Sequence, residues 1–125
     1  ADALAGVTGV RRVLYPGRID HPDHALANSL FHNAYGNMVS FEIDGGRDAV
    51  NRFVESARQI PFAPTLGDIG TTLSHPASSS HRALTVEGRA NLGICEGFFR
   101  LSVGIEPADM LITELRAALA AVTGE

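Results

Sequence analysis

Arg100 stands in the middle of an otherwise apolar run, GFFRLSVGIE, over residues 97–106. The alternation of this run predicts a strand with one buried face, formed by Phe99, Leu101, Val103 and Ile105. Arg100 then lies with Ser102 on the opposite face. The planar fork of a guanidinium fits a carboxylate, either an internal aspartate or glutamate or the α-carboxylate of an amino-acid substrate. The residues alone favour the internal ion pair, because internal carboxylates are plentiful.

The histidines raise the question of a metal site. His21 and His24 are three residues apart, and His75 and His81 flank a run of serines. A zinc site needs three or four convergent ligands, whereas the chain has one cysteine and no H-E-x-x-H pattern. Histidines beside prolines at the ends of elements are typical of caps and turns, so the sequence predicts no metal site. No serine stands in a G-x-S-x-G pattern, which disfavours a catalytic triad.

The remaining nucleophiles are few. Every one of the ten Lys+Arg residues is an arginine. A chain without lysine cannot form a side-chain Schiff base with a carbonyl group, so this kind of covalent catalysis is closed to it. Cys95 stands beside Glu96, and a nearby acid raises the pKa of a thiol. We therefore predict that Cys95 is packed and inert.

Composition bounds the rest of the molecule. With 125 residues, 45% of them hydrophobic, the chain can form one domain with a core. A net charge of −4, with both signs interspersed, offers no basic face for nucleic acid. No apolar run approaches the roughly 20 residues of a membrane span, and the first residues do not resemble a signal peptide. We expect a cytoplasmic protein that binds neither nucleic acid nor membrane.

The hydrophobic pattern predicts the elements that must position Arg100. Strands are expected over residues 37–43, 71–74 and 97–106, and a short strand is expected from Arg11 to Leu14. A helix is expected from an Asp20 N-cap to about His32, and others over residues 47–58, 85–93 and from Pro107 onward. In the strand at 37–43, Val39, Phe41 and Ile43 alternate with a polar face that includes Glu42. Strands with one apolar face and amphipathic helices to cover it predict a two-layer α+β sandwich with a mostly antiparallel sheet.

Several stretches together resemble a known family: VLYPGRIDHPDHALA, NMVSFEIDGG, TLGDIGTTLSHPASSSH and GFFRLSVGIE. They are similar to the C-terminal domain of the pyridoxal-phosphate-dependent enzymes of Cys/Met metabolism, or trans-sulfuration. That family includes cystathionine γ-synthase and lyases, methionine γ-lyase and the homoserine-ester sulfhydrylases. The resemblance runs from about Arg11 almost to the end. It implies the small C-terminal domain of a fold-type I transferase over residues 11–125, with residues 1–10 as the remnant of an interdomain linker.

The resemblance also implies roles for particular residues. Arg100 matches the arginine that binds the substrate α-carboxylate, and Thr65 matches a hydroxyl residue that faces the same carboxylate. The family's lysine and most of its pyridoxal-phosphate contacts belong to an N-terminal domain, so no catalytic or cofactor-binding residue is expected here. The complete enzyme is expected to be a homo-oligomer, a tetramer, acting on an amino-acid substrate by elimination or replacement at Cγ. This chain alone is expected to be inactive; the alternative is a non-catalytic scaffold or regulatory subunit.

Overall fold

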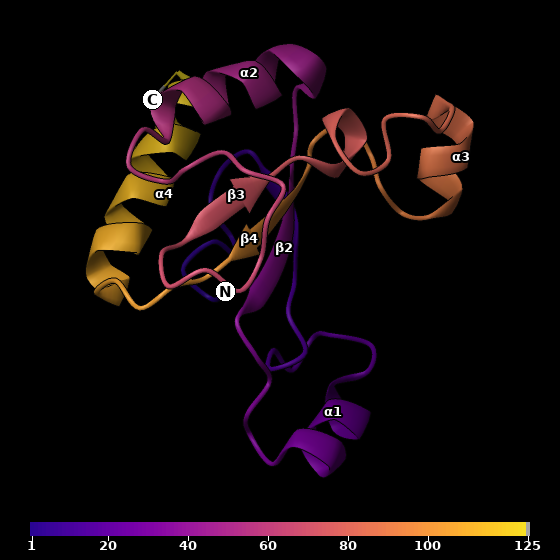
Figure 1. The fold of residues 1–125 in the computed structure, drawn as a ribbon, viewed down its shortest axis with the longest axis vertical. Helices are drawn as coiled ribbons and strands as arrows, with labels where there is room; N and C mark the ends of the chain where they lie inside the picture. The colour runs from indigo at the N-terminus through magenta and orange to yellow at the C-terminus, as the bar shows by residue number, and fades with distance from the viewer. Residues whose placement is uncertain (125) are drawn as a thin grey trace.

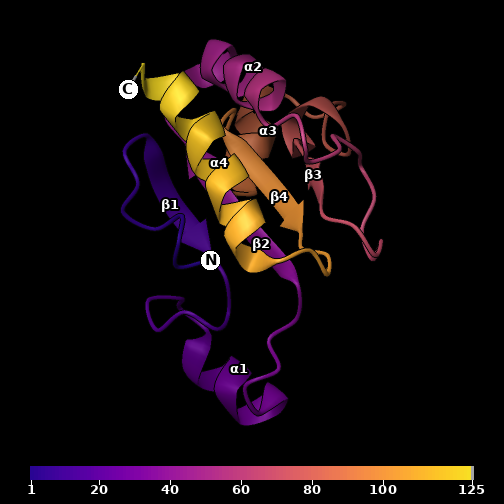
Figure 2. The ribbon, with the colours of Figure 1, turned by 90° about the vertical axis from the view of Figure 1, so that its left-hand side faces the viewer.

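The computed structural model describes residues 1–124 of the chain. Along the sequence the elements are β1 (Val10–Leu14), α1 (His24–Phe31), β2 (Met38–Ile43), α2 (Gly46–Ser56), β3 (Thr72–Ser74), a 3-10 turn η1 (Pro76–Ser78), α3 (Val86–Asn91), β4 (Phe98–Ser102) and α4 (Ala108–Thr123). The strands form one antiparallel sheet in the order β1-β2-β4-β3 (Figures 1 and 2). The predicted α+β class with an antiparallel sheet is confirmed.

One face of the sheet carries the hydrophobic core. The register pairs Phe41 with Phe99 and places Leu101 between Val39 and Leu73, so that these side chains share a face. The rings of Phe41 and Phe99 stack with centroids 5.4 Å apart. The ring centroids of Phe53 in α2 and Phe99 lie 4.9 Å apart, and all three phenylalanine side chains are fully buried. Burial of each such side chain contributes about 1.5–3 kcal/mol.

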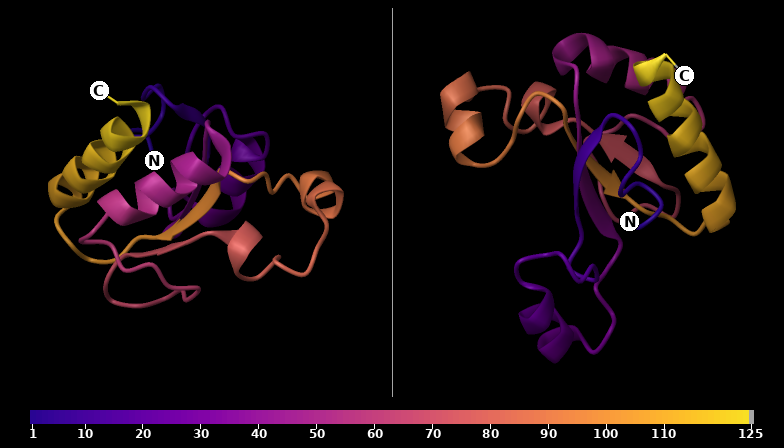
Figure 3. Two further views of the ribbon diagram at one scale, coloured as in Figure 1. Left: turned by 90° about the horizontal axis from the view of Figure 1, so that it is seen from above. Right: turned by 180° about the vertical axis from the view of Figure 1, so that it is seen from behind.

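The helices α2 and α4 cover this core face. Their inward stripes are the ones that the helical spacing predicts, with Ala49, Val50 and Phe53 from α2 and Leu115, Ala118 and Leu119 from α4. Figure 2 shows α4 lying across the strands, with α2 beside it. By contrast, α1 and α3 project away from the body of the molecule, as Figure 1 and the right-hand view of Figure 3 show. The second face of the sheet is therefore left without a covering helix.

Two predictions about element ends are wrong. Asp20 is not the N-cap of α1: its carboxylate is held by Arg18, with Nη2 and Oδ2 2.8 Å apart, and the helix begins at His24. Ile105 does not share the buried face of β4, because the strand ends at Ser102 and the side chain of Ile105 is 78% exposed. At the N-terminus, Leu4 packs into the core although the first residues form only turns.

Within residues 1–124, no helix combines the length and the hydrophobicity that crossing a membrane requires.

Candidate functional site

Arg100 lies on the second face of the sheet, as the alternation of β4 predicts. The register aligns it with Ser40 of β2 on one side and Ser74 of β3 on the other. The next row toward the C-terminal end of β4 pairs Ser102 with Thr72. A row of small hydroxyl side chains therefore surrounds a single guanidinium on a face that no helix covers.

The guanidinium of Arg100 has an unused donor. Its Nε is buried and makes no hydrogen bond within residues 1–124. Arg100 also takes part in none of the ion pairs that the described residues form, whereas Arg11, Arg12 and Arg18 each contact a carboxylate. The internal ion pair that the sequence left open is thus absent from the described part of the chain. A buried N–H without an acceptor costs about 1–3 kcal/mol, which favours a ligand at this position.

Thr65 belongs to the loop between α2 and β3, and this loop crosses the same face. The hydroxyl of Thr72 donates to the carbonyl oxygen of Thr65 over 3.3 Å, and Gly67 N donates to Ser102 Oγ, also over 3.3 Å. Thr72 and Ser102 form the row next to Arg100, at a spacing of about 7 Å along the strands. The fold therefore brings the exposed Thr65 and Arg100 to one region of the sheet.

Sequence reasoning missed the residues that fasten this loop. Glu106 accepts two hydrogen bonds from Thr71, at Oε1 from the backbone N–H over 2.7 Å and at Oε2 from the hydroxyl over 2.8 Å. Ser102, which holds Gly67, is 1% exposed. The polar residues that follow Arg100 in RLSVGIE are the signal that could have indicated this role, because a polar residue at the end of a strand needs a partner.

Both ring nitrogens of the buried histidine are engaged in hydrogen bonds. His75 contacts Ser78 Oγ through Nδ1 at 2.7 Å and the carbonyl oxygen of Glu96 through Nε2 at 2.6 Å. Burial lowers the pKa of His75, so the ring is neutral near pH 7 and joins η1 to the start of β4. Among residues 1–124, no group of three or more histidine, cysteine, aspartate or glutamate side chains could hold a metal ion.

Cys95 is protonated rather than activated. Burial, followed by the hydrogen bond to Glu42, raises the pKa of its thiol to about 11. The predicted direction is confirmed, but the responsible acid is Glu42 rather than Glu96. Burial opposes ionisation of Glu42, yet hydrogen bonds from Cys95 and Arg12 and the charge of Arg11 hold its pKa below the usual value. Sequence alternation placed Glu42 on the polar face, where these arginines leave it 3% exposed.

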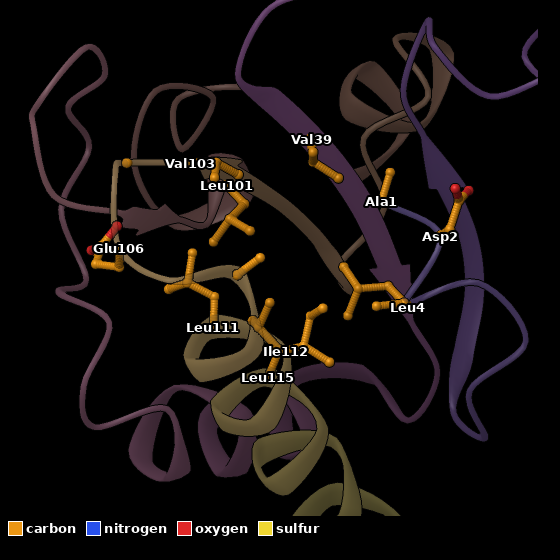
Figure 4. A pocket seen from close by; sticks show the side chains of 13 residues that line it. Ala1, Asp2, Leu4, Val39, Leu101, Val103, Glu106, Leu111, Ile112 and Leu115 are labelled. Atoms are coloured by element: carbon orange, nitrogen blue, oxygen red, sulfur yellow. The ribbon is translucent and has the colours of Figure 1, made fainter.

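The largest cavity described lies on the other side of the sheet from Arg100. Its volume is about 460 Å³, and it is formed between the first residues of the chain, the core face of β2 and β4, and the N-terminal half of α4. Figure 4 shows the apolar side chains that dominate its wall, with Leu4, Val39, Leu101 and Leu111 among them. Its carboxylates, Asp2 and Glu106, stand at its margins. None of the side chains that line the cavity is a cation, and the cavity is separate from the Arg100 site.

Comparison with known proteins places this geometry in a family. The sequence profile described as "Cys/Met metabolism PLP-dependent enzyme" matches residues 1–120. Over 122 residues the chain is 40% identical to the O-succinylhomoserine sulfhydrylase of Pseudomonas aeruginosa, and the match covers 98% of the chain and 30% of that enzyme. Over 121 residues it is 39% identical to the L-methionine γ-lyase of Pseudomonas putida, with 97% and 30% covered.

The fold agrees with the same group. A crystal structure of the cystathionine γ-synthase of Xanthomonas oryzae pv. oryzae, in complex with aminoacrylate and cysteine, superposes with a TM-score of 0.88 at 43% identity. The superposition covers 99% of this chain and 33% of that one, so the chain spans about a third of the length of its relatives. This chain therefore belongs to the pyridoxal-phosphate-dependent enzymes of Cys/Met metabolism.

Proposed function

We propose that this chain is the C-terminal, substrate-binding domain of a trans-sulfuration enzyme, and that Arg100 binds the α-carboxylate of an amino-acid substrate. The observation that carries the proposal is the buried Nε of Arg100, which has no acceptor within residues 1–124. A substrate carboxylate would satisfy this donor and one terminal nitrogen in a bidentate pair. A scaffold or regulatory subunit has no need for a guanidinium kept free in this way.

Thr65 supplies the second contact in this proposal. Its loop crosses the face of the sheet on which Arg100 lies, and its side chain is exposed there. A hydroxyl donates to one carboxylate oxygen while the guanidinium holds both, which fixes the rotation of the carboxylate as well as its position. Cystathionine is the ligand of a cystathionine γ-synthase structure with the same fold, which supports an amino acid as the substrate class.

The residues of this chain fit the substrate rather than the cofactor. The sequence contains no lysine, so the covalent attachment of pyridoxal phosphate must come from a domain outside this chain. When bound there, pyridoxal phosphate supplies an electron sink for carbanion chemistry at the substrate. Arg100 would orient the substrate for elimination or replacement at Cγ, and the chain alone would be inactive. The partner is an N-terminal cofactor-binding domain, within a homotetramer.

The test uses the holoenzyme that contains this chain. Arg100→Ala removes the bidentate pair, and we expect a loss of about 2–4 kcal/mol in transition-state binding. This corresponds to a fall in kcat/KM of roughly 30- to 1,000-fold at about 1.4 kcal/mol per decade. Arg100→Lys should recover only part of the activity, because an ammonium group is a point charge and cannot reproduce the two parallel hydrogen bonds.

Arg52→Ala is the matched control, because Arg52 is an exposed arginine on α2, away from the second face of the sheet. It should leave kcat/KM unchanged. The midpoint of thermal unfolding should change little in Arg100→Ala, since the guanidinium makes no ion pair with the described residues. A sharp fall in that midpoint, with kcat/KM per folded molecule near wild type, would instead identify Arg100 as an internal ion-pair partner and end the proposal.

A further inference from the structure

The residues that follow Arg100 fasten the loop that carries Thr65. Besides the bond from Gly67 N to Ser102 Oγ, Ile105 N donates to the carbonyl oxygen of Ile69 over 3.0 Å. Beyond the end of β4, these contacts replace the regular ladder of the sheet. At the edge of the Arg100 face, hydrogen bonds thus connect two loops, residues 102–106 and residues 67–71. We refer to this contact between the two loops as the joint.

Glu106 is the central group of this joint. Its two oxygens bind the N–H and the hydroxyl of Thr71, and the Thr71 hydroxyl also accepts a hydrogen bond from Gly104 N over 2.9 Å. Thr71 is 1% exposed, so its two donors are shielded from water, while the carboxylate of Glu106 is only partly buried. The bonds from Thr71 lower the pKa of Glu106, which is therefore ionised at neutral pH and accepts both bonds strongly.

Gly104 permits the close approach that the joint requires. A Cβ at this position would lie 2.4 Å from the carbonyl oxygen of Ile69 and 2.5 Å from Thr71 N. Real Cβ atoms do not come so near to backbone atoms, so any other residue would force the two loops apart. Gly70, on the opposite side of the joint, is not restricted in this way, because its nearest neighbour would be Glu106 Oε1 at 3.7 Å.

We propose that Glu106 and Thr71 are positioning residues that hold the Thr65 loop in register with Arg100, so that the two groups meet one carboxylate. The inference rests on the proposed function of Arg100 and adds the means by which recognition of the carboxylate is kept in place. Thr71 directly precedes β3, which begins at Thr72, and the loop from Thr65 is fixed at both ends, by Thr72 and by Glu106. Release of one end frees Thr65 to move relative to the sheet.

The experiment measures how strongly the holoenzyme prefers a ligand with an α-carboxylate. The probes are L-norleucine and pentylamine, which differ only in the carboxylate and carry no leaving group. Calorimetry gives a Kd for each, and the ratio of the pentylamine Kd to the norleucine Kd measures carboxylate recognition. Thermal unfolding is recorded for every variant.

Glu106→Ala should lower this ratio by roughly 10- to 100-fold, because misplacement of a ligand group by about 1 Å has effects of this size. Glu106→Gln, whose amide can both accept from the Thr71 N–H and donate to its hydroxyl, should recover most of the ratio. Thr71→Val keeps the shape of the side chain and removes only the hydroxyl. Thr71→Val should also lower the ratio, and it tests the positioning role if Glu106→Ala does not fold.

Glu114→Ala is the matched control. Glu114 also fastens a loop, since its Oε1 accepts the backbone N–H of Gln59 over 2.8 Å, but it does so from α4 on the core side of the sheet. It should lower the unfolding midpoint without changing the ratio. An unchanged ratio in Glu106→Ala and Thr71→Val, or an equal fall in Glu114→Ala, would overturn the inference. If Arg100→Ala itself left the ratio unchanged, the proposed function would fail first.

Discussion

Arg100 is the one arginine of residues 1–124 that is partly buried and yet forms no ion pair with a described carboxylate. Arg11 and Arg12 neutralise Glu42, with nitrogen to oxygen distances of 2.7 Å in both pairs. Arg47 and Arg89 flank Glu96 in the same manner. Arg100 stands among serines and a threonine, which can accept hydrogen bonds but carry no charge. At the scale of single residues, the site is defined by a guanidinium that has no carboxylate partner among the described residues.

Cys95 and Glu42 allow a test of the electrostatics next to this site. Because the folded thiol has a pKa of about 11, against 9.0 for the free group, its alkylation should remain slow through pH 9 and accelerate toward pH 11. The stability linked to this shift is complete below about pH 9 and is lost as the pH rises toward 11. Glu42→Gln removes the anion and should lower the pKa of Cys95 in the holoenzyme, as measured by iodoacetamide labelling against pH. An identical labelling profile in Glu42→Gln would contradict the assignment of Glu42 as the responsible acid.

The sequence alone could predict which face of the sheet Arg100 and Glu42 lie on, but not which groups contact them. The sequence indicated that Arg100 faces away from Phe99 and that a carboxylate is its natural ligand. It could not show that Glu42, which lies on the same face as Arg100, is neutralised by Arg11 and Arg12, since that depends on the register of β1 against β2, where Arg12 is paired with Glu42. The acid beside Cys95 was misassigned for the same reason, because Glu42 is distant in sequence and adjacent only across the sheet.

At the scale of elements, β4 does two different things along its length. Phe99 and Leu101 bind it to the core, while Arg100 and Ser102 face the uncovered side. The alternation was sufficient to predict this division. The end of the strand was not predictable, because the chain leaves the sheet after Ser102, where Val103 N donates to the carbonyl oxygen of Asn37 and Gly104 turns to meet residues 69–71. Ile105 is exposed as a consequence.

For helix α1, the end could be predicted from the sequence, whereas the beginning could not. Its end near His32 was predicted correctly, since His32 adopts a left-handed conformation with φ of 48° just after Phe31. Its beginning was not, because Asp20 satisfies the usual requirements for an N-cap and yet is bound by Arg18. Local sequence cannot distinguish these two uses of one carboxylate.

Gly104→Ala tests the joint between the two loops. A Cβ at this position meets backbone atoms that cannot rotate away, so we expect a loss of about 1–3 kcal/mol in the free energy of unfolding. Gly70→Ala, in the facing loop, should stay within about 0.5 kcal/mol, because its Cβ makes only ordinary contacts. Both values are measured by chemical denaturation of the holoenzyme. Equal effects of the two substitutions would show that the close approach at Gly104 is not under steric constraint.

At the scale of the whole molecule, the two faces of the sheet differ in what covers them. The helices α2 and α4 close one face (Figure 2), while no helix covers the other, which carries the guanidinium of Arg100 and the loop of Thr65. Because the chain spans about a third of its relatives, the natural occupant of that side in our proposal is the cofactor-binding domain, with the substrate held between.

The absence of lysine gives a prediction for the chain by itself. Mixed with pyridoxal phosphate and reduced with borohydride, the 125-residue chain should retain no adduct on any side chain, because no ε-amino group exists to form an imine. Only its N-terminal amine can react. Mass spectrometry of the digested product checks this, and a stable adduct at an internal residue would contradict the division of labour between the two domains.

The most direct test of the central claim is a crystal structure of the holoenzyme with L-norleucine bound. We predict that both oxygens of its carboxylate lie about 2.7–2.9 Å from two nitrogens of Arg100, one of which is Nε, with the Thr65 hydroxyl on one of the oxygens. The claim would be contradicted by a carboxylate held by another cation while Nε of Arg100 is bonded to an acid of the protein.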